Sequence, residues 1–464
     1  MSIRFGTSGW RAVIADQFTF GNAELVTNAI CCSLKDRGFP EGSKIVVGFD
    51  TRFMGEVFAG VAAAAASRHG FEVLRCVGPT PTPALSHAIR SQKACSGINF
   101  TASHNPPEYQ GIKFSTEDGA PALPEITRKI ESLIDDGAAE GTSPKGSIEE
   151  FDACPAFLDD LREKVKLDVI SRSGGRYAYD PLWGTGRGYL DRLLKESDIE
   201  VETLHDWRDV TFGGRSPEPG EAQLAELRER VVSDGLTLGL STDGDGDRFG
   251  IVDNNGEMIA ANQLIALLAD YLCESRGWTE GVARSVATTH LVDRVASHRG
   301  LKLFETPVGF KFIGEMINRG EIFLGGEESA GLSIKGHYPE KDGILACLLA
   351  AEAVAERGAS ITEQLEDLYS RVGRLESGRI GVKLTDEIAE GLGEKLAREP
   401  NEIGGRKVRS INRTDGVKFI FENESWLLMR PSGTEPLVRI YGESEDPDDL
   451  KDLLSEGRDY LLNN

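Results

Sequence analysis

Thr101-Ala102-Ser103-His104-Asn105-Pro106-Pro107 is a short polar loop that follows the apolar run 95–100. That run predicts a buried strand that ends in a turn. The two prolines fix the backbone after Ser103. A serine held on a stiff loop at a strand end is a candidate nucleophile or phosphate carrier. Ser, Asn and Pro are also ordinary turn residues, so the loop alone leaves a plain turn as the alternative.

The size and charge of the chain limit what it can be. With 464 residues it is too long for one hydrophobic core, and its length suggests about three domains. It has 52 Lys and Arg against 75 Asp and Glu, a formal net charge of −23. Such a surface repels nucleic acid and anionic membranes. Any anion-binding site must therefore be a local concentration of Arg and Lys.

The cysteines and the N-terminus indicate a cytoplasmic protein. The seven cysteines have no metal-type spacing and are expected to be reduced, mostly buried thiols. The N-terminal residues have no apolar core of a signal peptide. No run of about 18 apolar residues occurs, so no membrane span is expected.

Predicted helices and strands alternate up to residue 372, which favours α/β packing. We expect an α/β domain in residues 1–141, a second in 150–255 and a third in 256–372. Residues 136–147 are rich in Gly, Ser and charge and predict a linker, and a helix is expected over 151–166. Residues 373–464 combine short antiparallel strands with two flanking helices, which predicts an α+β domain.

The segment STDGDGDR (241–248) follows a predicted strand at 236–240. Asp243, Asp245 and Asp247 repel one another strongly unless a cation lies among them. The intervening glycines let the backbone curl so that all three carboxylates point inward, and such hard oxygen ligands suit Mg²⁺ or Ca²⁺. An EF-hand does not fit, because Arg248 and Asn254 stand where that loop needs Gly and Glu. A solvated acidic turn is the remaining alternative.

Two later loops carry groups that suit a sugar phosphate. Arg430, Ser432, Gly433 and Thr434 offer a guanidinium, two hydroxyls and a flexible backbone N–H, which together form a good phosphate cradle. A simple hairpin turn is the alternative. The loop GGEESAG (325–331) brings two carboxylates and a hydroxyl to a strand end, where they could accept hydrogen bonds from sugar hydroxyls. A solvated acidic loop is its alternative.

Two glycine-rich segments are less informative. The N-terminal segment 6–11 predicts a small-residue turn that delivers Arg11, and a functional Arg11 would need an anion nearby. The segment GTGRG (184–188) has the spacing G-x-G-x-G rather than G-x-G-x-x-G, so it does not indicate a dinucleotide site.

Taken together, these loops resemble those of the α-D-phosphohexomutases, nearest to the phosphoglucomutase branch. The resemblance covers the whole chain and rests on four motifs in family order and spacing: TASHNPP with GIKF (111–114) behind it, DGDGDR (243–248), GEESAG (326–331) and RPSGTEP (430–436). It implies a four-domain α/β architecture, with three α/β domains of mixed sheets and a C-terminal α+β domain around a central cleft.

The resemblance also implies an activity. Ser103 would carry a phosphoryl group, and that group together with Asp243, Asp245 and Asp247 would hold Mg²⁺. The phosphoserine would donate to a hexose phosphate, interconverting hexose 1-phosphate and hexose 6-phosphate through a hexose 1,6-bisphosphate that turns over in the cleft. Glucose is the expected sugar. The chain would act on this small molecule as a monomer or homodimer, without nucleic acid or membrane.

The remaining site residues are carried over by position. Ser103, His104, Lys113, Arg11 and Arg248 match the phosphoryl-transfer site, and Lys113 or His104 could move the hydroxyl proton. The residues that match substrate ligands are Glu327, Ser329, Lys341, Lys311, Arg430, Ser432, Gly433 and Thr434.

One departure bears on the sugar. Mannose- and glucosamine-type members resemble G-E-x-S-G-H in the sugar loop, whereas Gly331 stands here in place of the final histidine. A phosphomannomutase or dual-specificity enzyme is the near alternative. More distant ones are an aspartyl-phosphate phosphatase with Asp243 as nucleophile and a non-catalytic sugar-phosphate binding protein, against which the intact Ser103 argues.

Overall fold

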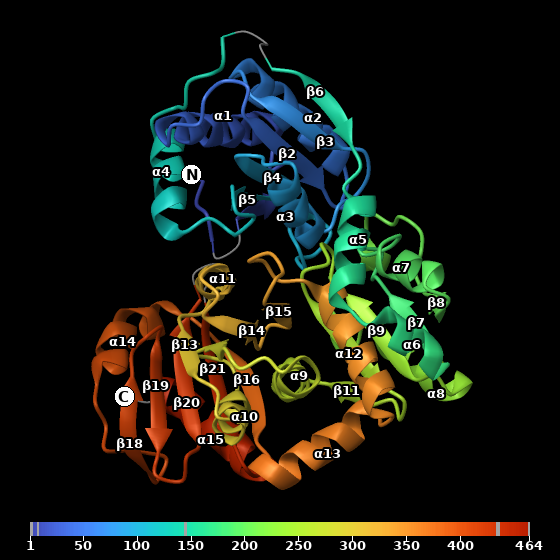
Figure 1. Ribbon diagram of the computed structural model, residues 1–464. Helices are drawn as coiled ribbons and strands as arrows, with labels where there is room; N and C mark the ends of the chain where they lie inside the picture. The colour runs from blue at the N-terminus through green and yellow to red at the C-terminus, as the bar shows by residue number, and fades with distance from the viewer. Residues whose placement is uncertain (1–2, 7–8, 143–145, 433–436, 463–464) are drawn as a thin grey trace.

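The first sheet of the molecule carries the serine loop (Figure 1). The computed structural model describes residues 3–6, 9–142, 146–432 and 437–462. The sheet is mixed, with strand order β1-β5-β4-β2-β3-β6, and β5 pairs antiparallel with both of its neighbours, β1 and β4. Its elements are β1 (Trp10–Val13), α1 (Phe20–Asp36), β2 (Lys44–Phe49), α2 (Gly55–Arg68), β3 (Glu72–Cys76), α3 (Thr82–Ser91), β4 (Ser96–Phe100), β5 (Tyr109–Thr116), α4 (Pro124–Asp135) and β6 (Ile148–Phe151).

Packing in this unit follows from its apolar residues. β2 and β4 are buried on both faces, as expected of central parallel strands. α1, α2 and α4 share one core cluster on one side of the sheet, while α3 belongs to a separate cluster that also holds Val46 and Leu74. The small alanines of α2 allow it to lie close against the strands.

Two elements of this unit differ from the sequence prediction. The N-terminal segment 6–11, predicted as a turn that delivers Arg11, leads into strand β1, which was not predicted and pairs with β5 so that Arg11 lies opposite Gly111. The predicted helix 151–166 is wrong at its start, because Ile148–Phe151 forms an edge strand parallel to β3. β6 is mostly exposed, so its sequence lacks the apolar alternation that indicates a strand, and pairing with β3 decides its conformation.

The second sheet is also mixed, with strand order β11-β10-β9-β7-β8. β9 and β10 form an antiparallel hairpin whose loop is the acidic segment, so the flanks are strands rather than the helices of an EF-hand. The predicted helix 220–232 begins only at Ala225, and α6, α7 and β8 were not predicted. The elements are α5 (Cys154–Lys164), α6 (Leu167–Ser173), β7 (Arg176–Asp180), α7 (Leu190–Glu196), β8 (Glu200–Thr203), the 3₁₀ helix η1 (Phe212–Gly214), α8 (Ala225–Asp234), β9 (Leu238–Thr242), β10 (Phe249–Asp253) and β11 (Met258–Ile259).

The third sheet, with order β13-β12-β14-β15, shares its core with the second. α12 is buried almost all round and packs between the two sheets (Figure 1). The strand predicted at 284–288 lies at Gly281–Ser285, and β15 was not predicted. The elements are α9 (Ala261–Arg276), β12 (Gly281–Ser285), α10 (Leu291–Arg299), β13 (Leu303–Thr306), α11 (Phe310–Asn318), β14 (Ile322–Glu327), β15 (Gly331–Ile334), α12 (Gly343–Arg357) and α13 (Ile361–Val372).

The fourth sheet is antiparallel throughout, with order β16-β21-β20-β19-β18-β17. The predicted α+β architecture of this domain is confirmed, although β21, an inner strand of the sheet, was not predicted. The elements are β16 (Glu376–Lys383), α14 (Asp386–Ala397), β17 (Glu402–Ile403), β18 (Arg406–Asn412), β19 (Val417–Phe421), β20 (Trp426–Pro431), β21 (Leu437–Ser444) and α15 (Pro447–Leu462). Within the described residues, no helix is long and apolar enough to cross a membrane.

Candidate active site

Three of the predicted loops follow the carboxyl ends of strands. The serine loop follows β4, the acidic loop follows β9, and the loop with Glu327 follows β14. In α/β sheets, ligands bind at this edge of the strands. The structure brings the serine loop and the acidic loop into direct contact.

Ser103 lies at the centre of that contact. Its side chain is buried, and its hydroxyl donates a hydrogen bond to Asp243 Oδ2 at 2.9 Å. The ring Nδ1 of His104 lies 3.3 Å from the same Oγ. The backbone of Ser103 has φ of 51°, in the left-handed region that non-glycine residues rarely adopt. The surrounding loop therefore holds this serine in a conformation that costs free energy.

A buried arginine that was not predicted holds the loop in that shape. Arg52 follows β2, and its Nε donates to Asp50 Oδ2 at 3.1 Å. Its two terminal nitrogens donate to three backbone carbonyls of the serine loop and one at the start of β5: those of Ser103 (2.7 Å), Asn105 (2.6 Å), Pro106 (2.7 Å) and Tyr109 (3.0 Å). The available signal was its position directly after a predicted parallel strand, at the edge where the serine loop also lies.

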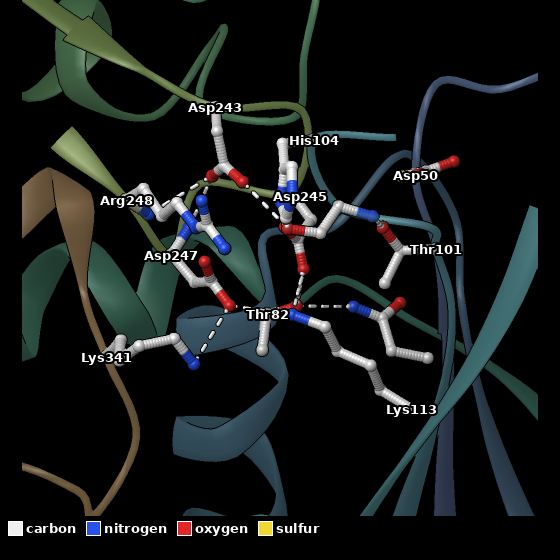
Figure 2. Close-up of polar contacts among 12 residues, drawn as sticks. Asp50, Thr82, Thr101, His104, Lys113, Asp243, Asp245, Asp247, Arg248 and Lys341 are labelled. Carbon is white, nitrogen blue, oxygen red and sulfur yellow. Dashed lines mark hydrogen bonds and ion pairs between the residues drawn. The ribbon is translucent and has the colours of Figure 1, made fainter. Parts of the chain in front are cut away.

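The three aspartates of the acidic loop converge as predicted (Figure 2). Asp243, Asp245 and Asp247 are all buried, and a ligand atom from each lies within 4.8 Å of the others. Asp245 Oδ1 and Asp247 Oδ1 are buried and have no hydrogen-bond partner among the described residues. Buried carboxylate oxygens need a partner, so a hard cation fits this group. Among the described residues this is the group of three acidic, His or Cys side chains that could hold a metal.

Two lysines neutralise part of this negative charge. Lys113 Nζ lies 2.6 Å from Asp245 Oδ2 and 2.7 Å from Asp247 Oδ2. Lys341 Nζ lies 3.1 Å from Asp247 Oδ2 and 2.7 Å from Glu340 Oε1. Burial opposes the charged amine, but the carboxylates prevail and raise the pKa of Lys113. Lys113 is therefore a poor proton acceptor in this arrangement.

The other groups near Ser103 differ in protonation. Burial, aided by Arg248 and Arg11, holds the pKa of His104 well below its usual value, so this imidazole is neutral. Arg11 Nη1 donates to Asn105 Oδ1 of the serine loop at 2.7 Å. Arg248 follows the acidic loop and pairs with Glu218 at 3.0 Å. Together with Arg52, the region around Ser103 thus has three guanidinium groups and a neutral histidine.

The sugar-loop candidates lie at the end of β14. Glu327 is buried, accepts a hydrogen bond from the Gly309 backbone at 2.7 Å, and has its pKa raised to about 7 by burial and by Glu328. Ser329 lines a cavity of about 510 Å³ that Arg248 also lines. Lys311, on α11, is half-buried, and burial lowers its pKa.

The phosphate-loop candidates lie at the end of β20. Arg430 Nε donates to Asp415 Oδ2 at 2.9 Å, and Ser432 is half-buried beyond it. Gly433 and Thr434 lie outside the described residues. The described contacts of Arg430 do not reach the serine loop or the acidic loop, so among the described residues Arg430 is not in direct contact with Ser103.

Comparison with known proteins agrees with this arrangement. Models of the phosphoglucomutase/phosphomannomutase family match in four segments: α/β/α domain I at residues 2–140, domain II at 155–256, domain III at 260–372 and the C-terminal domain at 381–459. The fold and the motifs together define a phosphohexomutase. The chain belongs to the phosphoglucomutase/phosphomannomutase family of the α-D-phosphohexomutase superfamily.

Individual relatives have several names. The chain is 30% identical to "Phosphoglucomutase/phosphomannomutase" of Thermococcus kodakarensis, covering 98% of this chain and 97% of the other. It is 31% identical to a "Probable phosphoglucosamine mutase" of Methanothermobacter thermautotrophicus, covering 99% and 98%. A crystal structure described as "putative phosphomannomutase" from Thermus thermophilus superposes with a TM-score of 0.88 at 33% identity and full coverage of both chains. These names differ in the sugar, so they do not decide it.

Proposed function

We propose that this protein interconverts hexose 1-phosphate and hexose 6-phosphate, with Ser103 as the phosphoryl carrier. The observation that supports this most is the 2.9 Å hydrogen bond from Ser103 Oγ to Asp243, which joins a loop of the first sheet to the acidic loop of the second. A strained, buried serine beside a candidate cation site suits phosphoryl transfer, because that reaction needs positioning and charge neutralisation above all.

The acidic loop is proposed to hold Mg²⁺. Within the part of the chain that the structure describes, Asp245 Oδ1 and Asp247 Oδ1 have no hydrogen-bond partner, and Asp243 Oδ2 accepts a hydrogen bond from Ser103. The donor set is all oxygen, which Mg²⁺ prefers. When bound, the ion would neutralise charge on the transferring phosphoryl group. Lys113 and Lys341 keep the remaining carboxylate oxygens in place.

The proposed transfer breaks the bond from phosphorus to Ser103 Oγ and forms a bond from phosphorus to a hexose hydroxyl oxygen. The hydroxyl proton then needs an acceptor, and Ser103 Oγ, which leaves with the electron pair of the broken bond, needs a proton in return. Of the two expected candidates, the neutral His104 suits this role better than Lys113, which its two carboxylate partners keep protonated. The resulting hexose 1,6-bisphosphate would turn over and return its other phosphoryl group to Ser103.

Glucose is the proposed sugar, and the surroundings of Gly331 support this choice. A Cβ built on Gly331 would lie 2.2 Å from Lys341 Cδ. The lysine side chain therefore fills the space that a histidine at position 331 would need. Glu327 and Ser329 are the proposed ligands of the sugar hydroxyls, while Arg430 and its neighbours would hold the non-transferred phosphate.

The test is a comparison of kcat/KM for the 1-phosphates of glucose, mannose and glucosamine, with glucose 1,6-bisphosphate and Mg²⁺ present. We expect conversion to the 6-phosphates with the highest kcat/KM for glucose. Equal values for glucose and mannose would replace this with a dual-specificity enzyme. Absence of conversion for every sugar phosphate would contradict the proposed function.

A further inference from the structure

The first residue of α3 touches the acidic loop from the opposite domain. The Thr82 backbone N–H donates to the Asp245 carbonyl at 2.9 Å. Its hydroxyl donates to Asp245 Oδ2, and the threonine is buried (Figure 2). Thr82 and Asp245 are 163 residues apart in the sequence. One residue of the first domain thus holds both the main chain and the side chain of a candidate metal ligand.

A second hydrogen bond determines which way the threonine hydroxyl points. Asn99 Nδ2 donates to Thr82 Oγ1 at 3.1 Å, and Asn99 is also buried. Because the amide occupies the acceptor side of Oγ1, the hydroxyl hydrogen is available to Asp245. Asn99 lies on β4, directly before the serine loop, and pairs with Lys113 across the sheet. The chain Asn99–Thr82–Asp245 therefore links the strand that carries Ser103 to the acidic loop.

This chain leaves one oxygen of Asp245 for a cation. Oδ2 is held by Thr82 and by Lys113 at 2.6 Å, while Oδ1 is buried and no described residue forms a hydrogen bond to it. Without the hydroxyl, Asp245 could rotate, because only Lys113 would still fix Oδ2. Ordering a carboxylate in advance reduces the free-energy cost of binding a cation.

We propose that Thr82, directed by Asn99, is a positioning residue that orients Asp245 for a divalent cation and fixes the acidic loop relative to Ser103. This inference rests on the proposed function only in assuming that the acidic loop binds a divalent cation. It predicts an effect on cation affinity rather than on sugar-phosphate affinity.

The test is Mn²⁺ binding to the metal-stripped, full-length protein, measured by electron paramagnetic resonance. Specific binding is the fraction lost in Asp243→Asn. Thr82→Val replaces the hydroxyl by a methyl group and leaves the shape of the side chain nearly unchanged. It should lower the affinity for Mn²⁺ about 10- to 100-fold, as loss of a hydrogen bond to a metal-ligating side chain does. Thr82→Ser keeps the hydroxyl and should bind as the wild type does. In the two Thr82 variants, assayed at saturating Mg²⁺, the KM for hexose phosphate should stay unchanged.

Thr185 supplies a matched control. It is buried against Gly246 of the acidic loop, and its hydroxyl has no hydrogen-bond partner in the described segments of the chain. Thr185→Val should therefore leave Mn²⁺ affinity unchanged. Asn99→Ala removes the hydrogen bond that directs the Thr82 hydroxyl, so it should also lower the affinity for Mn²⁺. If Thr82→Val does not fold, Asn99→Ala alone tests the proposal.

The outcomes separate the two proposals. If wild type binds Mn²⁺ and both Thr82→Val and Asn99→Ala bind it equally well, the inference is overturned and the proposed function is unaffected. If wild type binds no specific Mn²⁺, the metal site of the proposed function is overturned together with the inference. Weakening by Thr82→Val without rescue in Thr82→Ser would show that packing, not the hydroxyl, is responsible, and would also overturn the inference.

Discussion

The buried carboxyl of Glu327 combines a structural cost with a proposed ligand role. Burial and Glu328 raise its pKa from 4.5 to about 7. An acid whose pKa is raised on folding stabilises the native state fully below its unfolded pKa, and that contribution is lost as pH rises through the folded value. Stability due to Glu327 should therefore fall between about pH 4.5 and 7.

Glu327→Gln should remove this pH dependence. The difference in unfolding free energy between wild type and variant should change by up to about 3 kcal/mol across that pH window. Urea unfolding at several pH values measures it. Glu315→Gln, at an exposed ion pair on α11, is the control and should follow wild type at every pH. If the free energy of unfolding changed with pH in the same way in wild type and in Glu327→Gln, the raised pKa of Glu327 would be contradicted.

Sequence patterns located the residues with chemistry better than the residues that position them. Ser103 and the three aspartates stand in short segments whose composition already indicates their chemistry. Arg52 and Thr82 contact residues that are far away in the sequence. Arg52 is 51 residues from Ser103, and Thr82 is 163 residues from Asp245. No local pattern encodes such contacts, because the Arg52 contact depends on β2 and β4 being neighbours in the first sheet, and the Thr82 contact depends on how the first and second sheets approach each other.

At the scale of elements, the serine loop depends on Arg52. Arg52→Met removes the guanidinium group that donates to four carbonyls and to Asp50. The free energy of unfolding should therefore be about 3–5 kcal/mol lower than in wild type. Arg52→Lys keeps the positive charge but loses the planar guanidinium with its several N–H donors. This variant should have a lower kcat with little change in KM. Arg75→Met, at an exposed ion pair of β3, is the control for thermal unfolding and kinetics. Normal kcat in Arg52→Lys would show that the loop holds its shape unaided.

The acidic loop is the second element with a direct test. EDTA should inactivate the enzyme and Mg²⁺ should restore it. Asp245→Asn replaces an anionic ligand by a neutral one, so the Mg²⁺ concentration for half-maximal activity should rise. Asp234→Asn, at an exposed position of α8, should match wild type. Full activity in metal-free buffer would exclude the proposed role of the loop.

Elements with strong local signals were predicted well, and edge elements were not. α2, with its run of alanines, and β2, with consecutive buried apolar residues, have local patterns that determine them. β6 is exposed and forms because β3 offers an unpaired edge. β21 begins directly after the phosphate-loop segment. The turn-forming residues of that segment gave no indication of a following strand, although β21 is an inner strand of its sheet.

At the scale of the molecule, the fourth sheet is attached to the third through buried polar contacts. Lys418 reaches across to donate to the Val286 carbonyl at 2.9 Å, and its Nζ lies 2.8 Å from His290 Nε2. Glu443 accepts from the His290 backbone at 2.9 Å. These contacts determine where the proposed phosphate loop lies relative to the sugar loop.

Arg430 tests the proposal that one loop serves both orientations of the bisphosphate. Arg430→Ala should lower kcat/KM about 10- to 100-fold in the forward and the reverse direction alike, because a charge-assisted hydrogen bond is lost in both. Arg409→Ala, at an exposed ion pair of the same sheet, should change neither direction. A loss confined to one direction would mean that Arg430 serves a single orientation of the substrate.

The central claim is that Ser103 carries the phosphoryl group, and mapping the phosphate tests it most directly. Enzyme incubated with radiolabelled glucose 1,6-bisphosphate would be digested and its phosphopeptide sequenced by mass spectrometry. We predict label on Ser103, stable to hydroxylamine, and none in Ser103→Ala, which should still bind sugar phosphate but not turn it over. Hydroxylamine-labile label on Asp243 would contradict the account and indicate an aspartyl-phosphate mechanism.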